Sequence, residues 1–194
     1  ACTLQSVQGA IIVMLSHGLS TGALFFIIGM LYERRHTRLI GAFGGLARVM
    51  PVFAAIFTLV ALDSIALPGT SGFVGEFLVL LGSFGRHPVA AAIAVTVVIF
   101  AAGYLLWALQ RIIYEKLDKP ENEKLKDLSL REFVVLAPLV IGILWIGLYP
   151  APVLRRIEPA ARRYIELAEP QARRTPVYIV PATPGPDHPP AGGR

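Results

Sequence analysis

The sequence predicts an all-α membrane protein with about four transmembrane helices, the second one discontinuous, followed by an amphipathic surface helix and a disordered Pro-rich tail. Of the 194 residues, 55% are hydrophobic and only 16% are charged, and the mean hydropathy is +0.62. Soluble domains are about one quarter charged. The apolar residues also occur in runs of about 20 or more, which is enough to cross a hydrocarbon core of about 30 Å. One run is too long for a single span and is interrupted by a Pro-Gly pair.

The net charge, the cysteine content and the first residues of the chain further limit which kind of protein this is. The formal net charge of +5 does not indicate nucleic-acid binding, because the Lys and Arg residues lie mainly between the apolar runs. The single cysteine, Cys2, cannot form a disulfide or a metal cluster within the chain. The chain has no signal peptide and no initiator Met, so we expect it to be a fragment of a longer protein.

The first predicted span covers residues 7–31 and ends at a basic stretch. Its Gly18 and Gly22 form a G-x-x-x-G pattern, which allows another helix to approach closely. We expect the polar side of this helix to face protein or water rather than lipid. That side carries two pairs of polar residues at i,i+4 spacing: Ser16 with Ser20, and His17 with Thr21.

The second apolar run, residues 51–84, is the feature around which a functional site is predicted. As one continuous helix it would be about 50 Å long, well beyond the hydrocarbon core. A break divides it into halves at residues 51–67 and 71–84. Thr70 or Ser71 is expected to cap the second half, because the break frees N–H groups that need partners in lipid. The predicted helix break comprises Pro68, Gly69, Thr70, Ser71 and Gly72.

Two further spans are predicted, at residues 89–113 and 131–149, so that the transmembrane region covers residues 1–152. A capping box of the S-x-x-E type at Ser129 indicates where the last span begins. The first and third loops contain more basic residues than the opposite side. We therefore expect these loops to be cytoplasmic and the chain end to face outward.

After the spans, residues 153–174 repeat apolar side chains at helical spacing, with arginines elsewhere on the helical wheel. This pattern predicts an amphipathic segment at the membrane surface, interrupted at Pro159 and ending at Pro170. Residues 175–194 are rich in Pro and Gly, and we expect them to be disordered.

Three ionisable residues are candidates for proton transfer. Glu76 lies just after the break, where an isolated charged carboxylate costs several kcal/mol, so it is suited to alternate between neutral and charged forms. The alternative is a protonated acid that only packs. His17 can exchange protons near neutral pH or can make only a structural hydrogen bond. Asp63 can be a second relay group or can bond the backbone freed at the break, and the sequence favours neither role.

Several motifs occur in a characteristic order: Ser16-His17-Gly18-Leu19-Ser20, then Leu31-Tyr32-Glu33-Arg34-Arg35-His36-Thr37-Arg38, then Gly44-Gly45-Leu46, then Leu67-Pro68-Gly69-Thr70-Ser71-Gly72-Phe73-Val74-Gly75-Glu76-Phe77. They resemble the antiporter-like membrane subunit M of bacterial respiratory complex I, the counterpart of mitochondrial NADH dehydrogenase chain 4. The resemblance extends to about Tyr149. It implies a larger helical subunit, of which this chain forms the last spans.

The resemblance also implies a function. The family's distal membrane carboxylate falls on Glu76 and its relay histidine on His17, whereas a neutral residue is expected at Asp63. The chain would be the C-terminal fragment of a proton-translocating subunit of NADH:quinone oxidoreductase, which couples electron transport from NADH to quinone to proton pumping. The alternatives are a subunit of a multisubunit cation/proton antiporter or of a membrane-bound hydrogenase, and a non-catalytic membrane anchor.

No cofactor or metal site is predicted in this chain. It lacks a haem-spaced His pair, a cysteine cluster, a Walker loop and a dinucleotide fingerprint. The resemblance implies that NAD, FMN, Fe–S clusters and quinone are held by partner subunits, and that this chain is not active alone. The expected partners are other complex I membrane subunits, the lipid bilayer, protons and internal water, with no nucleic acid. The expected location is the bacterial inner membrane, with several spans and a periplasmic C-terminus.

Overall fold

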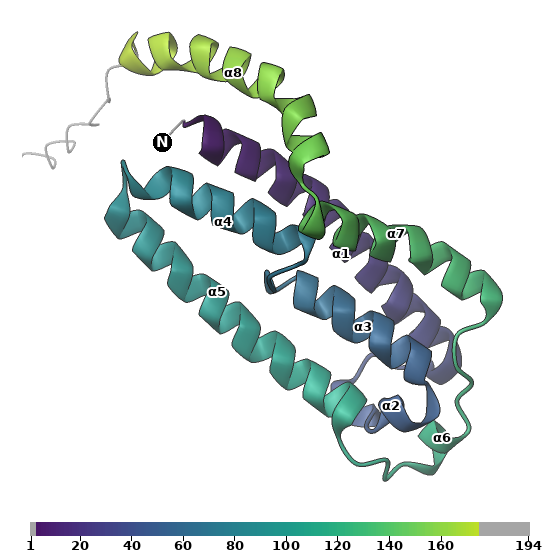
Figure 1. Cartoon of the computed structure of the whole chain (residues 1–194). Helices are drawn as coiled ribbons and strands as arrows, with labels where there is room; N and C mark the ends of the chain where they lie inside the picture. The colour runs from purple at the N-terminus through teal and green to yellow at the C-terminus, as the bar shows by residue number, and fades with distance from the viewer. Residues whose placement is uncertain (1–2, 175–194) are drawn as a thin grey trace, which may run out of the picture.

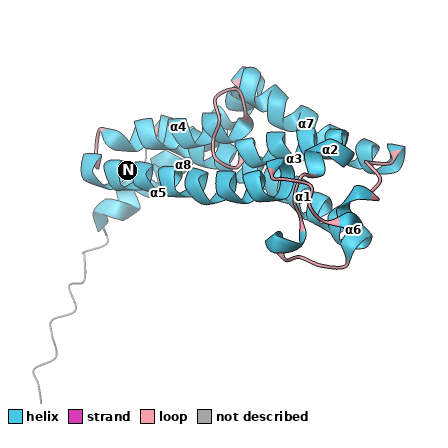
Figure 2. Cartoon of the chain, turned by 90° about the horizontal axis from the view of Figure 1, so that it is seen from below, coloured by secondary structure: helices cyan, strands magenta, loops and turns pink. Residues whose placement is uncertain are grey.

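The computed structural model describes residues 3–174, with side chains as far as Ala168. Every regular element in this part of the chain is helical, and it contains no strand (Figure 2). The predicted all-α membrane fold class is confirmed, whereas the predicted disordered tail, residues 175–194, lies outside the described residues. The α-helices, labelled in Figure 1, are α1 (Leu4–Arg35), α2 (Leu46–Val49), α3 (Pro51–Asp63), α4 (Ser71–Phe84), α5 (Pro88–Leu109), α6 (Pro120–Glu123), α7 (Leu130–Leu148) and α8 (Ala151–Arg174). Two short elements, the 3-10 helix η1 (Ile40–Ala42) and the π-helical η2 (Gln110–Tyr114), complete the order.

The membrane-crossing part consists of long helices and one broken pair. Helix α1, helix α5 with η2, and helix α7 are long and apolar enough to cross a membrane. Helices α3 and α4 are shorter, and they follow one another with a loop between them (Figure 1). The first half is shorter than predicted, since α3 ends at Asp63 rather than at Leu67. Pro68 disfavours helical backbone in the residue before it, and Ala66 and Gly69 have positive φ angles of 56° and 96°.

Local capping explains where two of the long helices begin. Helix α1 begins earlier than the predicted span because Thr3 and Ser6 form a capping box at its start. At the start of α7, the N–H of Ser129 donates to Glu132 at 2.7 Å, and the N–H of Glu132 donates to the Ser129 hydroxyl at 3.3 Å. The capping box predicted at Ser129 is therefore confirmed.

Helix α8 is one continuous helix, so the predicted interruption at Pro159 and the predicted end at Pro170 are wrong. A proline removes one helical hydrogen bond, which bends a helix without ending it when the neighbouring residues remain bonded. Helix α8 curves accordingly in Figure 1. It packs against α1: Ala161 is buried, and the amide of Gln8 donates to the carbonyl oxygen of Leu154 at 3.4 Å.

The hydrophobic core lies between α1, α3 and α7, together with the segment 43–50 and the end of α5. Helix α4 packs mainly against α1, and the two backbones approach closely. A Cβ atom added to Gly75 would lie 2.7 Å from Val13. By contrast, a Cβ at Gly18 or Gly22 would meet no atom within 4 Å in the described residues. The predicted G-x-x-x-G face is thus without a helical partner in this part of the chain.

An ion pair joins the end of α1 to the start of α7. The guanidinium of Arg34 donates to both carboxylate oxygens of Glu132, at 2.7 and 2.8 Å. It also donates to the carbonyl oxygens of Met30 and Lys126 at 2.9 and 3.0 Å. A bidentate pair with further acceptors holds the guanidinium in one orientation, which fixes the two helix ends relative to each other.

We predict that Glu132→Ala lowers the free energy of unfolding by roughly 2 to 4 kcal/mol, because it leaves the Arg34 charge without its partner. Only 17% of the Arg34 side chain and 8% of the Glu132 side chain are exposed. Thermal unfolding of the purified protein in detergent provides the measurement. Glu121→Ala is the matched control: its pair with Arg35 is 3.3 Å long and the Glu121 side chain is 67% exposed, so less than about 1 kcal/mol is expected. Equal losses for the two variants would contradict the prediction.

We also predict that Gly147→Ala is destabilising by about 1 to 3 kcal/mol through overpacking. Gly147 of α7 lies directly against the loop of the broken span, where an added Cβ would overlap the carbonyl oxygen of Gly69 and lie 2.5 Å from Thr70 Cα. The control is Gly103→Ala in α5, where the added Cβ meets nothing within 4 Å. The same unfolding measurement should show little change for this control.

Candidate functional site

The break between α3 and α4 is organised by the carboxylate of Asp63, the last residue of α3. This side chain is 1% exposed. Its Oδ1 accepts hydrogen bonds from the Ser71 hydroxyl at 2.9 Å and from the N–H of Gly72 at 2.8 Å. Its Oδ2 accepts from the hydroxyl of Ser16 at 3.4 Å. Asp63 thereby connects α3, α4 and α1 at one point.

The predicted cap of the second half-helix is wrong. Thr70 occupies the N-cap position but makes no side-chain cap, and its hydroxyl donates instead to the carbonyl oxygen of Leu67 at 2.7 Å. Ser71 lies inside α4, and its hydroxyl is hydrogen-bonded to Asp63 and, at 2.8 Å, to the Ser16 hydroxyl. The N–H of Gly72 is satisfied by Asp63 because the chain folds back after α3 and brings this carboxylate to the start of α4.

The predicted break residues therefore divide between the loop and the helix. Pro68 and Gly69 lie in the loop, while Ser71 and Gly72 belong to the first turn of α4. Gly72 allows a close approach, since a Cβ at this position would overlap the carbonyl oxygen of Asp63. The start of α4 is thus placed directly against the end of α3.

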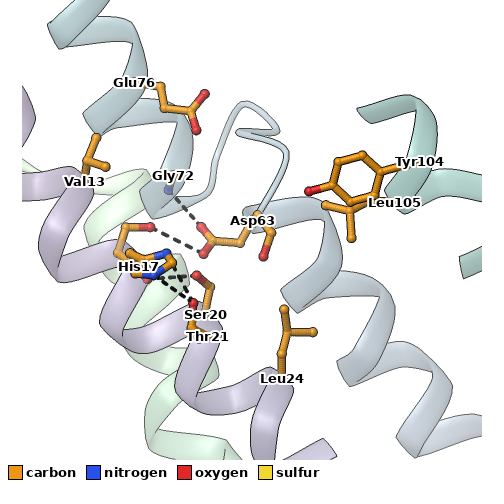
Figure 3. Close-up of a pocket in the computed structure, with 12 residues that line it drawn as sticks. Val13, His17, Ser20, Thr21, Leu24, Asp63, Gly72, Glu76, Tyr104 and Leu105 are labelled. Carbon is orange, nitrogen blue, oxygen red and sulfur yellow. Dashed lines mark hydrogen bonds between the residues drawn. The ribbon is translucent and has the colours of Figure 1, made fainter. Parts of the chain in front are cut away.

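A pocket of about 320 Å³ brings the three candidate residues together. Its walls come from α1, α3, α4 and α5, as Figure 3 shows. It is large enough for several water molecules. Its lining residues are Val13, Ser16, His17, Ser20, Thr21, Leu24, Asp63, Ser64, Gly72, Glu76, Tyr104 and Leu105.

Glu76 lies in the second turn of α4 and is partly buried. Its carboxylate forms no hydrogen bond with any residue from 3 to 168, unlike the carboxylate of Asp63. Besides the shared pocket, Glu76 borders a mostly apolar cavity of about 500 Å³ between α1, α4 and α5. A carboxylate with few fixed partners beside a water-sized space can change its protonation state without breaking a hydrogen-bond network.

His17 lies at the rim of the same pocket, and its side chain is exposed. Its ring nitrogen Nδ1 is 3.2 Å from the hydroxyl of Thr21, one turn further along α1. Its neighbours Ser16 and Ser20 are buried and face the interior. The polar side of α1 is therefore divided, with Ser16 directed to the break and His17 to the opening of the pocket.

The link between Ser16 and the break has no local signal in the sequence. The spacing of Ser16 and Ser20 predicts only a polar helix face, but the contacts of Ser16 with Asp63 and Ser71 join residues 47 and 55 positions apart. No local spacing rule connects such positions. Tyr104 of α5 likewise lines the pocket, although nothing in its apolar sequence context indicates this. Within the described residues, no group of three or more His, Cys, Asp or Glu side chains could hold a metal ion.

Known proteins with the same sequence pattern support the resemblance noted above. Residues 1–101 match the family model described as NADH:quinone oxidoreductase/Mrp antiporter, TM. The NADH-quinone oxidoreductase subunit M of Rhodobacter capsulatus is 43% identical over 166 residues, covering 86% of this chain and 32% of that protein. The NADH-ubiquinone oxidoreductase chain 4 of Marchantia polymorpha is 37% identical over 163 residues, covering 84% of this chain and 33% of that protein.

A solved structure agrees with these relatives. A chain of respiratory complex I from Thermus thermophilus with bound NADH superposes with a TM-score of 0.77 and 35% sequence identity, covering 84% of this chain and 35% of that chain. This chain spans about one third of the length of the relatives that it matches. The resemblance to subunit M and chain 4 is confirmed, and this multi-pass membrane chain belongs to the NADH:quinone oxidoreductase/Mrp antiporter transmembrane family.

Proposed function

We propose that this chain forms part of a proton-translocating membrane subunit of NADH:quinone oxidoreductase, in which electron transport from NADH to quinone is coupled to proton pumping. The observation that carries the proposal is the partly buried Glu76, just after a broken helix and beside a pocket with room for water. Ionisable residues inside a membrane span are costly and are mostly functional. The names of the relatives from Rhodobacter capsulatus and Marchantia polymorpha support the same assignment.

In this mechanism, Glu76 takes up and releases the proton, and His17 exchanges protons at the pocket rim. Water in the pocket would connect the two side chains, since both line it. Neither residue accepts electrons. The driving force would come from redox chemistry elsewhere in the complex, through charge rearrangement that changes the electrostatic cost of a negative charge at Glu76.

In the assembled complex, the redox cofactors would lie in other subunits and not in this chain. NAD, FMN, Fe–S clusters and quinone would be bound by partner subunits, and this chain would contact the other membrane subunits of complex I. We assign the chain to the bacterial inner membrane, with a periplasmic C-terminus. The basic residues near the ends of α1 and α5 support this orientation, because such residues favour the cytoplasmic side.

A second function is a cation/proton antiporter subunit. The family description itself includes Mrp antiporters alongside NADH:quinone oxidoreductase. In that case Glu76 and His17 would exchange protons against a cation gradient without any coupled electron transfer. As a subunit of a membrane-bound hydrogenase, the chain would use the same helices. As a non-catalytic membrane anchor, it would use neither Glu76 nor His17 for proton transfer.

We predict that Glu76→Gln in the full-length protein abolishes coupled proton pumping without preventing assembly. Glutamine has nearly the same shape as glutamate but cannot release a proton. Proton uptake by membrane vesicles during NADH-dependent quinone reduction measures the ratio of protons to electrons. Glu115→Gln, which removes an exposed carboxylate in a loop, is the control and should pump normally.

His17→Ala, measured in parallel, should reduce the pumping rate. A normal ratio of protons to electrons in Glu76→Gln would contradict the proposed role of that residue. Normal turnover and pumping in both variants would favour the non-catalytic anchor. Pumping that depends on a sodium gradient rather than on NADH would favour the antiporter.

A further inference from the structure

We infer that Asp63 is a positioning residue, which holds the start of α4 and thereby Glu76 in place, and is not a proton carrier. The inference rests on the proposed function in that Glu76 is the group being positioned. It also assigns different roles to two carboxylates that line the same pocket. The reason lies in how each carboxylate is bonded.

Two groups at the start of α4 donate hydrogen bonds to the carboxylate of Asp63. One oxygen, Oδ1, accepts both from the Ser71 hydroxyl and from the Gly72 N–H, at 2.9 and 2.8 Å. Loss of this oxygen, as in Asp63→Ala, would leave two donors without their acceptor. Ser71 is 0% exposed, so no bulk water is available to replace the lost bond. Loss of a partner from a buried polar group costs the full desolvation of that group.

The Asp63 carboxylate meets two kinds of hydrogen-bond donor. The N–H groups in the first turn of an α-helix have no partners within the helix, and together with the helix dipole they favour a negative charge. Helix α4 is 14 residues long, and its first turn meets the Asp63 carboxylate through Gly72. The Ser71 hydroxyl adds a neutral donor, and the single proton of the Ser16 hydroxyl can be given either to Ser71, at 2.8 Å, or to Oδ2, at 3.4 Å. Asp63 is thus engaged with the start of α4, whereas Glu76 has no hydrogen-bond partner among residues 3–168.

The same contacts place Glu76. Glu76 is only five positions beyond Ser71, slightly more than one helical turn. Gly72 leaves no space between the start of α4 and the carbonyl oxygen of Asp63, and Gly75 brings the next turn of α4 against Val13 of α1. A shift or fraying at the start of α4 would therefore be transmitted to the Glu76 side chain over fewer than two turns.

Asparagine at position 63 separates the two roles. Its Oδ1 can accept from Ser71 and Gly72 as the carboxylate does, and its Nδ2 can donate to the Ser16 hydroxyl, which can act as an acceptor. Asparagine cannot carry a proton. A positioning role thus predicts that Asp63→Asn is tolerated and Asp63→Ala is not, whereas a relay role predicts that both variants fail.

The test compares Asp63→Asn, Asp63→Ala and Ser71→Ala in the full-length, assembled enzyme. Amide hydrogen exchange of residues 71–77 reports the order at the start of α4, and vesicle proton uptake reports pumping. In Asp63→Ala we expect exchange to accelerate about tenfold, as for loss of an ordinary helix cap, with a parallel loss of pumping. Asp63→Asn should keep exchange within about twofold of the wild type and retain most of the pumping.

Each opposing result is decisive. Loss of pumping in Asp63→Asn with unchanged exchange would show that Asp63 carries protons. Unchanged exchange in Asp63→Ala would show that the carboxylate does not hold α4. If Asp63→Ala fails to assemble, Ser71→Ala, which removes one donor and keeps the Gly72 contact, should show a smaller acceleration, and Asp63→Asn still decides between the roles. Normal pumping in Glu76→Gln would overturn the proposed function but leave the exchange comparison intact.

Discussion

The need to satisfy backbone groups at a helix break inside a membrane governs how this chain folds. In lipid, a free N–H group costs several kcal/mol, and no water is at hand to replace a partner. The chain meets this need at the start of α4 with Asp63, which is itself buried and would be unfavourable without donors. The carboxylate and the helix start are therefore stable only together. Helix α1 is tied to the same point through Ser16.

The other half of the broken span begins in a similar way. Met50 occupies the N-cap position of α3 without a side-chain cap. The N–H groups of Val52 and Phe53 instead donate to the two carboxylate oxygens of Asp127, at 2.8 and 3.0 Å. Each half-helix thus begins at a carboxylate from outside its own sequence. Asp127 lies just before α7, and its carbonyl oxygen also accepts a hydrogen bond from Arg34 at 3.3 Å. This second cap therefore couples the start of α3 to the end of α1 and the start of α7.

This arrangement separates structural from chemical carboxylates. Asp63 and Asp127 each accept hydrogen bonds from backbone N–H groups at the start of a half-helix. Glu76 lies one turn further along, has no fixed hydrogen-bond partner among residues 3–168, and faces space that water can fill. A rigid helix start next to an unengaged acid is the combination that proton exchange at a defined position needs, since the acid can change charge while the backbone stays in place.

The sequence by itself determined the fold class, the broken span and the identity of Glu76 and His17 as candidates. Those features depend on local properties: runs of apolar residues, a Pro-Gly interruption, and ionisable groups where lipid disfavours them. It also located the capping box at Ser129, because both partners lie within one turn. The partner of the second half-helix, the continuity of α8 through Pro159, and the contacts of Asp63 were decided by tertiary structure. Each depends on contacts between positions that the chain brings together only after folding, where geometry rather than spacing selects the donor and the acceptor.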